Sequence, residues 1–188
     1  MASKFSSLQR QARGKINLGG MARMVLLAES DFTAGWPIDA DIVDGECTEA
    51  PRLAEGVIAA ELTFDNHSGR AKSTKKGAIG YQNVEHEVDC KFAGCSKEQL
   101  AAVLKFLNEG GVIIAFYKDG TRRVYGASWN PLVIEDSDDS GAKADDPKSI
   151  TFKGKADGFG WHAPFLAESV TLATDTAAVK PMPFAIAP

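Results

Sequence analysis

Cysteine and long apolar runs are both scarce in this chain of 188 residues. The three cysteines are an odd number and too few for a disulfide framework, which excludes the class of small secreted domains stapled by disulfides. No apolar run approaches the ~20 residues of a membrane-spanning helix, and we expect no membrane span. The segment 1–15 also has no apolar stretch of the kind found in secretory signals. We therefore expect synthesis in a reducing cytoplasm.

An excess of basic residues is also absent. The chain has 21 Lys and Arg against 25 Asp and Glu, and a formal net charge of −4. Surfaces that bind nucleic acid are normally basic, so this balance argues against a nucleic-acid-binding protein. Hydrophobic residues make up 44% of the chain and charged residues 24%, which is enough apolar material for the core of one globular domain.

Two ligand-binding motifs are present only in part. Residues 68–74 resemble a phosphate-binding loop, but Asn66 and Ala71 stand where that motif needs glycine. We interpret this segment as part of an exposed basic loop. The acidic segment that begins at Asp136 resembles the start of a calcium loop, but Pro147 stands where the twelfth-position Glu should be. We interpret it as a solvated loop, and we leave open whether residues 135–146 bind a cation.

A third cluster contains potential metal ligands, namely His86, Cys90 and Cys95. Zinc is normally held by four ligands at recognised spacings, and no fourth ligand is evident here. On a strand His86 and Cys90 share a face, so we predict that both are core residues. Glu85 and Glu87 need no catalytic explanation on a wet strand face, and no nucleophile or dinucleotide motif occurs. We expect no enzyme activity, no metal and no cofactor.

The clearest secondary-structure signal is strict alternation between residues 84 and 92. A period of two over this length is typical of a strand with one buried and one wet face. The wet face carries acidic residues at positions 85, 87 and 89. The core face carries Val84, His86, Val88, Cys90 and Phe92.

A helix is predicted at 97–108. Ser96 and Gln99 have the spacing of a capping box, and two glycines at 110 and 111 are expected to end the helix. One apolar stripe at helical spacing is expected to pack against the sheet; it consists of Leu100, Val103, Leu104 and Leu107.

The remaining elements complete a β-rich domain. Asp119-Gly120 predicts a type I′ hairpin turn within 112–129. Further strands are expected at 57–64, 81–92 and 150–156, with a long polar loop at 66–80. We predict an α+β, mainly β fold, an antiparallel β-sandwich or open barrel with one packed α-helix. A single domain, 16–173, would lie between a flexible N-terminal arm, 1–15, and an extended C-terminal arm, 174–188.

This order of elements resembles the phage tail-tube protein family, whose fold is shared with the type VI secretion tube protein. The segment Gly19–Ala28 and the hairpin Lys118–Gly126 are similar to segments of virion structural proteins. The resemblance implies a structural virion protein made in the bacterial host cytoplasm. Its subunits would stack as hexameric rings around a DNA conduit in the tail. The implied partners are copies of itself, other tail proteins, and genomic DNA that passes through without specific binding.

The resemblance also gives roles to two groups of charged residues. The basic residues of the 66–80 loop are candidates for an oligomer interface, docking against the acidic 135–146 region of a neighbouring ring. They are Arg70, Lys72, Lys75 and Lys76. The acidic strand residues Glu85, Glu87 and Asp89 are candidates for the wall of the lumen. Two other functions stay open: a different virion component, such as a connector or decoration protein, and a monomeric ligand-binding β-domain.

Overall fold

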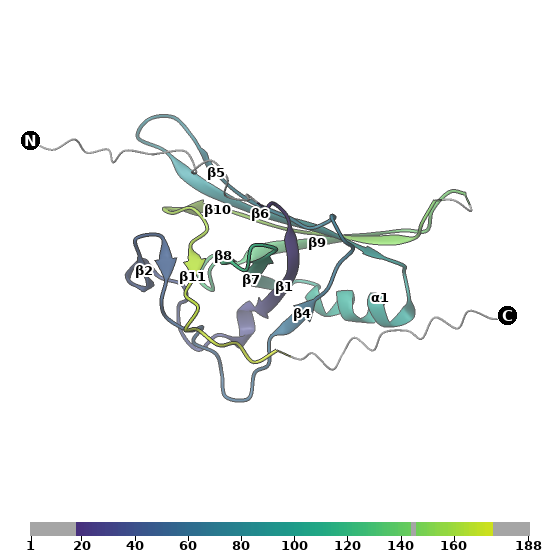
Figure 1. Cartoon of the computed structure of the whole chain (residues 1–188), viewed down its shortest axis with the longest axis horizontal. Coiled ribbons are helices and arrows are strands. Elements are labelled where there is room, and N and C mark those ends of the chain that lie inside the picture. The colour runs from purple at the N-terminus through teal and green to yellow at the C-terminus, as the bar shows by residue number, and fades with distance from the viewer. Residues whose placement is uncertain (1–17, 144–145, 175–188) are drawn as a thin grey trace, which may run out of the picture.

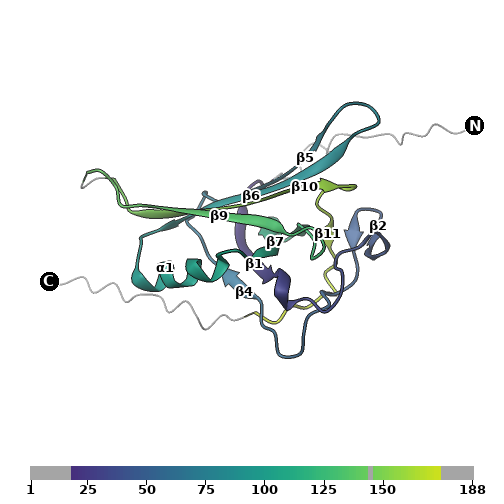
Figure 2. The same cartoon turned by 180° about the vertical axis from the view of Figure 1, so that it is seen from behind.

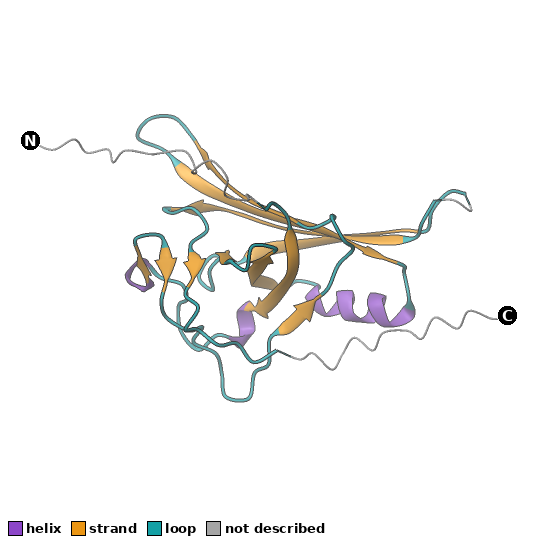
Figure 3. Cartoon of the chain, viewed as in Figure 1, coloured by secondary structure: helices purple, strands orange, loops and turns teal. Residues whose placement is uncertain are grey.

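In a computed structural model of the protein, residues 18–143 and 146–174 are described. The predicted arm 1–15 lies outside these residues, as does the predicted C-terminal arm beyond Thr174. Strands dominate the described chain, accompanied by one short α-helix (Figure 3). This confirms the α+β, mainly β class.

The elements follow one another in an order that is mostly strand. The α-helix is α1 (Lys97–Val103), and the three 3-10 turns are η1 (Glu29–Asp31), η2 (Asp39–Asp41) and η3 (Leu104–Phe106). The strands are β1 (Met21–Ala28), β2 (Ile42–Val43), β3 (Glu46–Cys47), β4 (Ala60–Leu62), β5 (Arg70–Lys76), β6 (Asn83–Ala93), β7 (Gly110–Tyr117), β8 (Arg122–Tyr125), β9 (Leu132–Asp139), β10 (Ser149–Phe159) and β11 (Phe165–Leu166).

All these strands belong to one sheet with the order β2-β3-β11-β8-β7-β9-β10-β6-β5. Off this path, β1 pairs with β7, and β4 pairs with β1. The sheet turns over at β9, whose first residues pair with β7 and whose remainder pairs with β10. Long strands β5, β6, β10 and β9 therefore form one layer above a second layer that contains β1, β7 and β8 (Figures 1 and 2). This two-layer arrangement is the one that the alternating strands predicted.

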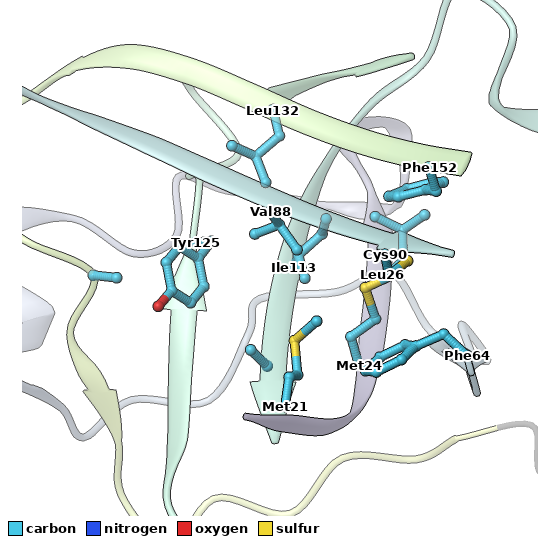
Figure 4. Close-up of a cluster of buried hydrophobic side chains, with 12 residues drawn as sticks. Met21, Met24, Leu26, Phe64, Val88, Cys90, Ile113, Tyr125, Leu132 and Phe152 are labelled. Atoms are coloured by element: carbon cyan, nitrogen blue, oxygen red, sulfur yellow. The ribbon is translucent and has the colours of Figure 1, made fainter. Parts of the chain in front are cut away.

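The main core lies between the two layers (Figure 4). Phe152 and Val88 point into this core from β10 and β6 of the long layer, and Met24 and Ile113 point into it from β1 and β7 of the other layer. All four are at most 1% exposed. A second buried cluster covers the opposite face of β1 and β7 and includes Trp36. Both strands are thus buried on two faces, which explains their continuous apolar runs.

The helix begins as predicted but is shorter and differently packed. The Ser96 hydroxyl accepts from the Gln99 N–H, and the Gln99 side chain accepts from the Ser96 N–H, so the capping box is confirmed. The α-helix ends at Val103 and continues as the 3-10 turn η3. Asn108, with a φ of 60°, takes the left-handed conformation that was expected of the glycines at 110 and 111, which instead begin β7.

The predicted packing of the leucine stripe is wrong. Leu104 and Leu107 are 69% and 73% exposed. Phe106 packs on the core instead and meets Phe152 edge to face, with ring centres 5.9 Å apart. The change from α to 3-10 geometry rotates the last turn, so the aromatic ring faces the sheet in place of the leucines.

The hairpin between β7 and β8 is confirmed, but its turn is not type I′. Only Gly120 of the Asp119-Gly120 pair has a positive φ. The Gly120 N–H donates to the Tyr117 carbonyl, and the Tyr117 N–H to the Thr121 carbonyl. This is a type I turn followed by a left-handed glycine, the usual three-residue hairpin loop. The Asp119 carboxylate accepts from the Thr121 N–H and hydroxyl, which fixes the turn without a left-handed Asp.

Two segments predicted as loops are in part strands. Residues 70–76 form β5 along β6, and residues 136–139 form the end of β9 along β10. Both are rich in charge, which hid their alternation behind a polar composition. Conversely, the strand predicted at 57–64 is reduced to β4.

Candidate assembly interface

The basic and acidic candidates identified in the sequence lie side by side in one chain. β5 and β6 pair antiparallel, with Arg70 opposite Asp89 and Lys72 opposite Glu87. On the other side of β6, β10 places Lys153 opposite Asp89 and Lys155 opposite Glu87. Because side chains at paired positions share a face, the acidic column of β6 stands between two basic columns.

Glu85 is the most enclosed member of this charged ladder. Its carboxylate bonds to the Lys76 ammonium at 2.6 Å and to the Lys155 ammonium at 3.1 Å. Hydrogen bonds from Lys76 and then Lys155 lower the pKa of Glu85. Glu85 is only 6% exposed although it lies on the outer face of the sheet.

The acidic strand face is therefore not the free anionic wall that the alternation predicted. Glu87 bonds to Lys72 at 3.1 Å. Burial raises the pKa of Asp89, which lies near Glu87 as well as Arg70. The face carries both signs in alternating columns, because each acidic residue of β6 has basic neighbours on the adjacent strands.

The long layer has two free edges of opposite charge. Among the described residues, β5 pairs with β6 alone, and β9 beyond Val133 pairs with β10 alone. Each edge thus leaves one side of a strand without main-chain partners, a template for pairing with another chain. The β5 edge carries Arg70, Lys72, Lys75 and Lys76, and the β9 edge carries Glu135, Asp136, Asp138 and Asp139.

The β5–β6 hairpin ends in an apolar tip formed by residues 77–82. Ile79 is 94% exposed and Tyr81 is 86% exposed. A turn in which the Tyr81 N–H donates to the Ala78 carbonyl at 3.0 Å holds the tip. Gly77 has a φ of 97°, and an added Cβ would clash with the Tyr81 carbonyl. The tip projects past the end of β10 (Figure 1).

His86 and Cys90 are core residues, as predicted. The His86 ring accepts from the Gly126 N–H at Nδ1 and faces the Trp161 carbonyl at 3.2 Å through Nε2. It stacks on Phe159 with ring centres 4.1 Å apart. Burial lowers the pKa of His86 to about 4 and raises the pKa of the Cys90 thiol to about 12. Neither environment favours metal binding or nucleophilic attack.

The partial ligand motifs do not fold as ligand loops. The phosphate-loop-like segment runs through extended β5, so its backbone does not curl around an anion. The first third of the calcium-like segment, 136–139, is in β9, and the Asp139 carboxylate accepts from the Gly141 N–H at 2.9 Å. Within residues 18–143 and 146–174, no cluster of three His, Cys, Asp or Glu side chains could hold a metal ion.

The strand edges of β5 and β9 and the apolar tip were not predicted from the sequence. For β5 a signal was present, because basic residues alternate with small ones from Arg70 to Ser73 and predict a strand. The tip had a signal too, since Ile79 and Tyr81 stand among three glycine and alanine residues, Gly77, Ala78 and Gly80.

Comparison of the chain with protein-family models, curated proteins and solved structures found no match. In the part of the chain that is described, no helix has the length and apolar character to cross a membrane.

Proposed function

We propose that this protein is a structural subunit that assembles with copies of itself into rings, and that these rings stack into a tube like that of a phage tail. The proposal needs no catalytic or ligand-binding site. It requires surfaces that join one subunit to the next in a fixed orientation.

The observation that carries the proposal is the pair of oppositely charged free edges on the long sheet. β5 and β9 lie on opposite sides of the same four-stranded layer β9-β10-β6-β5. A basic edge on one copy and an acidic edge on the next can pair head to tail, and such contacts close into a ring when the rotation allows. Complementary charge would fix the order of the pairing and speed encounter.

This arrangement modifies the interface inferred from the sequence. The basic residues at 70–76 would still meet the acidic region that begins at 135. However, they would meet it as strand edges within a ring, because residues 70–76 form the strand β5 and not part of a loop. The outer face of the long sheet, with Glu85, Glu87 and Asp89, is our candidate for the lumen. Its alternating charges would neither hold nor strongly repel passing DNA.

Charge reversal at the two edges tests the proposal. Lys75 lies opposite Val84 and forms no ion pair among the described residues, so Lys75→Glu changes the edge without breaking the ladder. Lys75→Glu alone, and Asp138→Lys alone, should weaken assembly in sedimentation velocity. The double variant reverses both edges and should regain assembly.

Lys105→Glu, in the exposed turn after α1, is the matched control and should assemble normally. A wild-type chain that stays a compact monomer at high concentration would refute the proposal and favour the ligand-binding β-domain. Assembly that is indifferent to both edge reversals would exclude the edges from the contact.

A further inference from the structure

An aromatic hollow opens beside the end of β10. Its lining consists of Ile38, Asp39, Trp129, Gly160 and Trp161, and its volume is about 440 Å³. The hollow is wide and shallow, closer to an open surface than to an enclosed pocket. Trp129 is 49% exposed and Ile38 is 38% exposed, so the apolar walls of the hollow are open to solvent.

The walls are held in place by contacts within the chain. The Trp129 Nε1–H donates to the Pro37 carbonyl at 2.9 Å. The Trp129 ring meets the Trp161 ring edge to face, with ring centres 5.7 Å apart, and its centre lies 5.9 Å from that of the Phe159 ring. Rigid aromatic groups lose little conformational entropy on binding, which is why they recur as anchors of interfaces.

The same chain carries a matching projection, the hairpin tip. Ile79 and Tyr81 together present an aliphatic and an aromatic side chain that have almost no contacts of their own. The tip extends beyond the last pair between β6 and β10, Val84 with Phe159. Trp161 follows Phe159 by two residues but lies back under the sheet, where its carbonyl faces His86. The tip therefore leaves its own hollow empty.

Charge also favours a match between two copies. Asp39 on the lining of the hollow is exposed. Lys75 beside the tip is exposed and unpaired among the described residues. A tip that enters the hollow would bring a basic strand end toward an acidic wall.

We propose that the hairpin tip of one copy, with Tyr81 and Ile79, inserts into the aromatic hollow of a second copy. This inference rests on the proposed function, because it requires self-assembly, and it adds a specific anchor. One aromatic side chain buries ~150–250 Å², far less than the ~1,200–2,000 Å² of a stable interface. The tip is therefore an energetic centre of a larger contact in which the strand edges provide most of the area.

The test compares assembly of wild type with tip and hollow variants by sedimentation velocity over a range of concentrations. Tyr81→Ser removes the anchor, and Trp129→Ala removes a wall. Loss of a central aromatic anchor should raise the concentration for half-assembly about thirtyfold or more. Asp39→Lys is a second hollow variant that keeps the aromatic contacts intact and should also weaken assembly. Val43→Ser, at an exposed apolar position elsewhere, should have no effect.

A mixture of the tip variant and the hollow variant tests insertion most directly. Tyr81→Ser chains keep an intact hollow, and Trp129→Ala chains keep an intact tip. An equal mixture should form a dimer that neither variant forms alone, because one tip–hollow contact is restored.

Two outcomes would overturn the inference. If wild type assembles and the tip and hollow variants assemble equally well, insertion is refuted while the proposed function stands. If wild type does not assemble at all, both are refuted.

Discussion

Acidification from pH 6.5 to 5 should destabilise the protein through one buried side chain, His86. The imidazole is 0% exposed, and its charged or titratable neighbours, Arg123 and His162, oppose a positive charge on the ring. Burial lowers its pKa from 6.5 to about 4. The folded state therefore keeps His86 neutral over a pH range in which the unfolded chain binds a proton.

The direction of the stability change follows from proton uptake. Between the two pKa values the unfolded state holds more protons, so the free energy of unfolding falls as the pH falls. Full stability is present above pH 6.5, and it declines down to about pH 4. At about 1.4 kcal/mol per pH unit, the loss between pH 6.5 and 5 is roughly 1.5–2 kcal/mol. Glu85 and Asp41, whose pKa values are lowered by their basic partners, add their losses only at lower pH.

The measurement is urea unfolding at several pH values, at protein concentrations too low for assembly. His86→Phe should be less stable overall, because the Gly126 N–H loses its acceptor, but its stability should be flat from pH 6.5 to 5. His67→Gln, at an exposed position, should keep the wild-type slope. A flat wild-type profile, or an unchanged slope in His86→Phe, would refute the assignment.

Three further predictions concern stability, each measured by chemical unfolding. Leu104→Ala should cost under about 1 kcal/mol because Leu104 is largely exposed, whereas Phe152→Ala in the core should cost about 3–5 kcal/mol; equal losses would contradict the packing of η3. Gly111→Ala should lower the free energy of unfolding by about 1–3 kcal/mol, because its new Cβ would lie 2.7 Å from Leu26 Cδ1 and 2.8 Å from the Leu27 carbonyl oxygen. Gly19→Ala, where nothing lies within 4 Å of the new Cβ, should leave it unchanged. Asp41→Asn should cost about 1–3 kcal/mol, because the Asp41 carboxylate accepts two bonds from Arg52 at 2.6 and 2.8 Å and one from the Ile38 N–H; a neutral effect would show that the pair is not formed in solution.

The sequence predicted those elements whose signal is local. The alternation of 84–92 gives β6, the Ser96 and Gln99 pair gives the start of α1, and Asp119-Gly120 gives the hairpin. In each case the residues that decide the structure are neighbours along the chain, so their pattern is visible before folding.

What escaped prediction depends on contacts distant in sequence. β5 is a strand because β6 provides partners of opposite charge, and its polar composition resembles that of a loop. The end of α1 follows from Phe106 meeting Phe152, some 46 positions away in the numbering. The candidate interface shares this property, since its two edges are brought to opposite sides of one layer only by the strand order β9-β10-β6-β5.

A cryo-electron microscopy map of the wild-type assembly tests the central claim most directly. We expect rings in which β5 of each subunit pairs through its main chain with β9 of the next. Monomers at high concentration, or rings in which both of these edges face solvent, would contradict it.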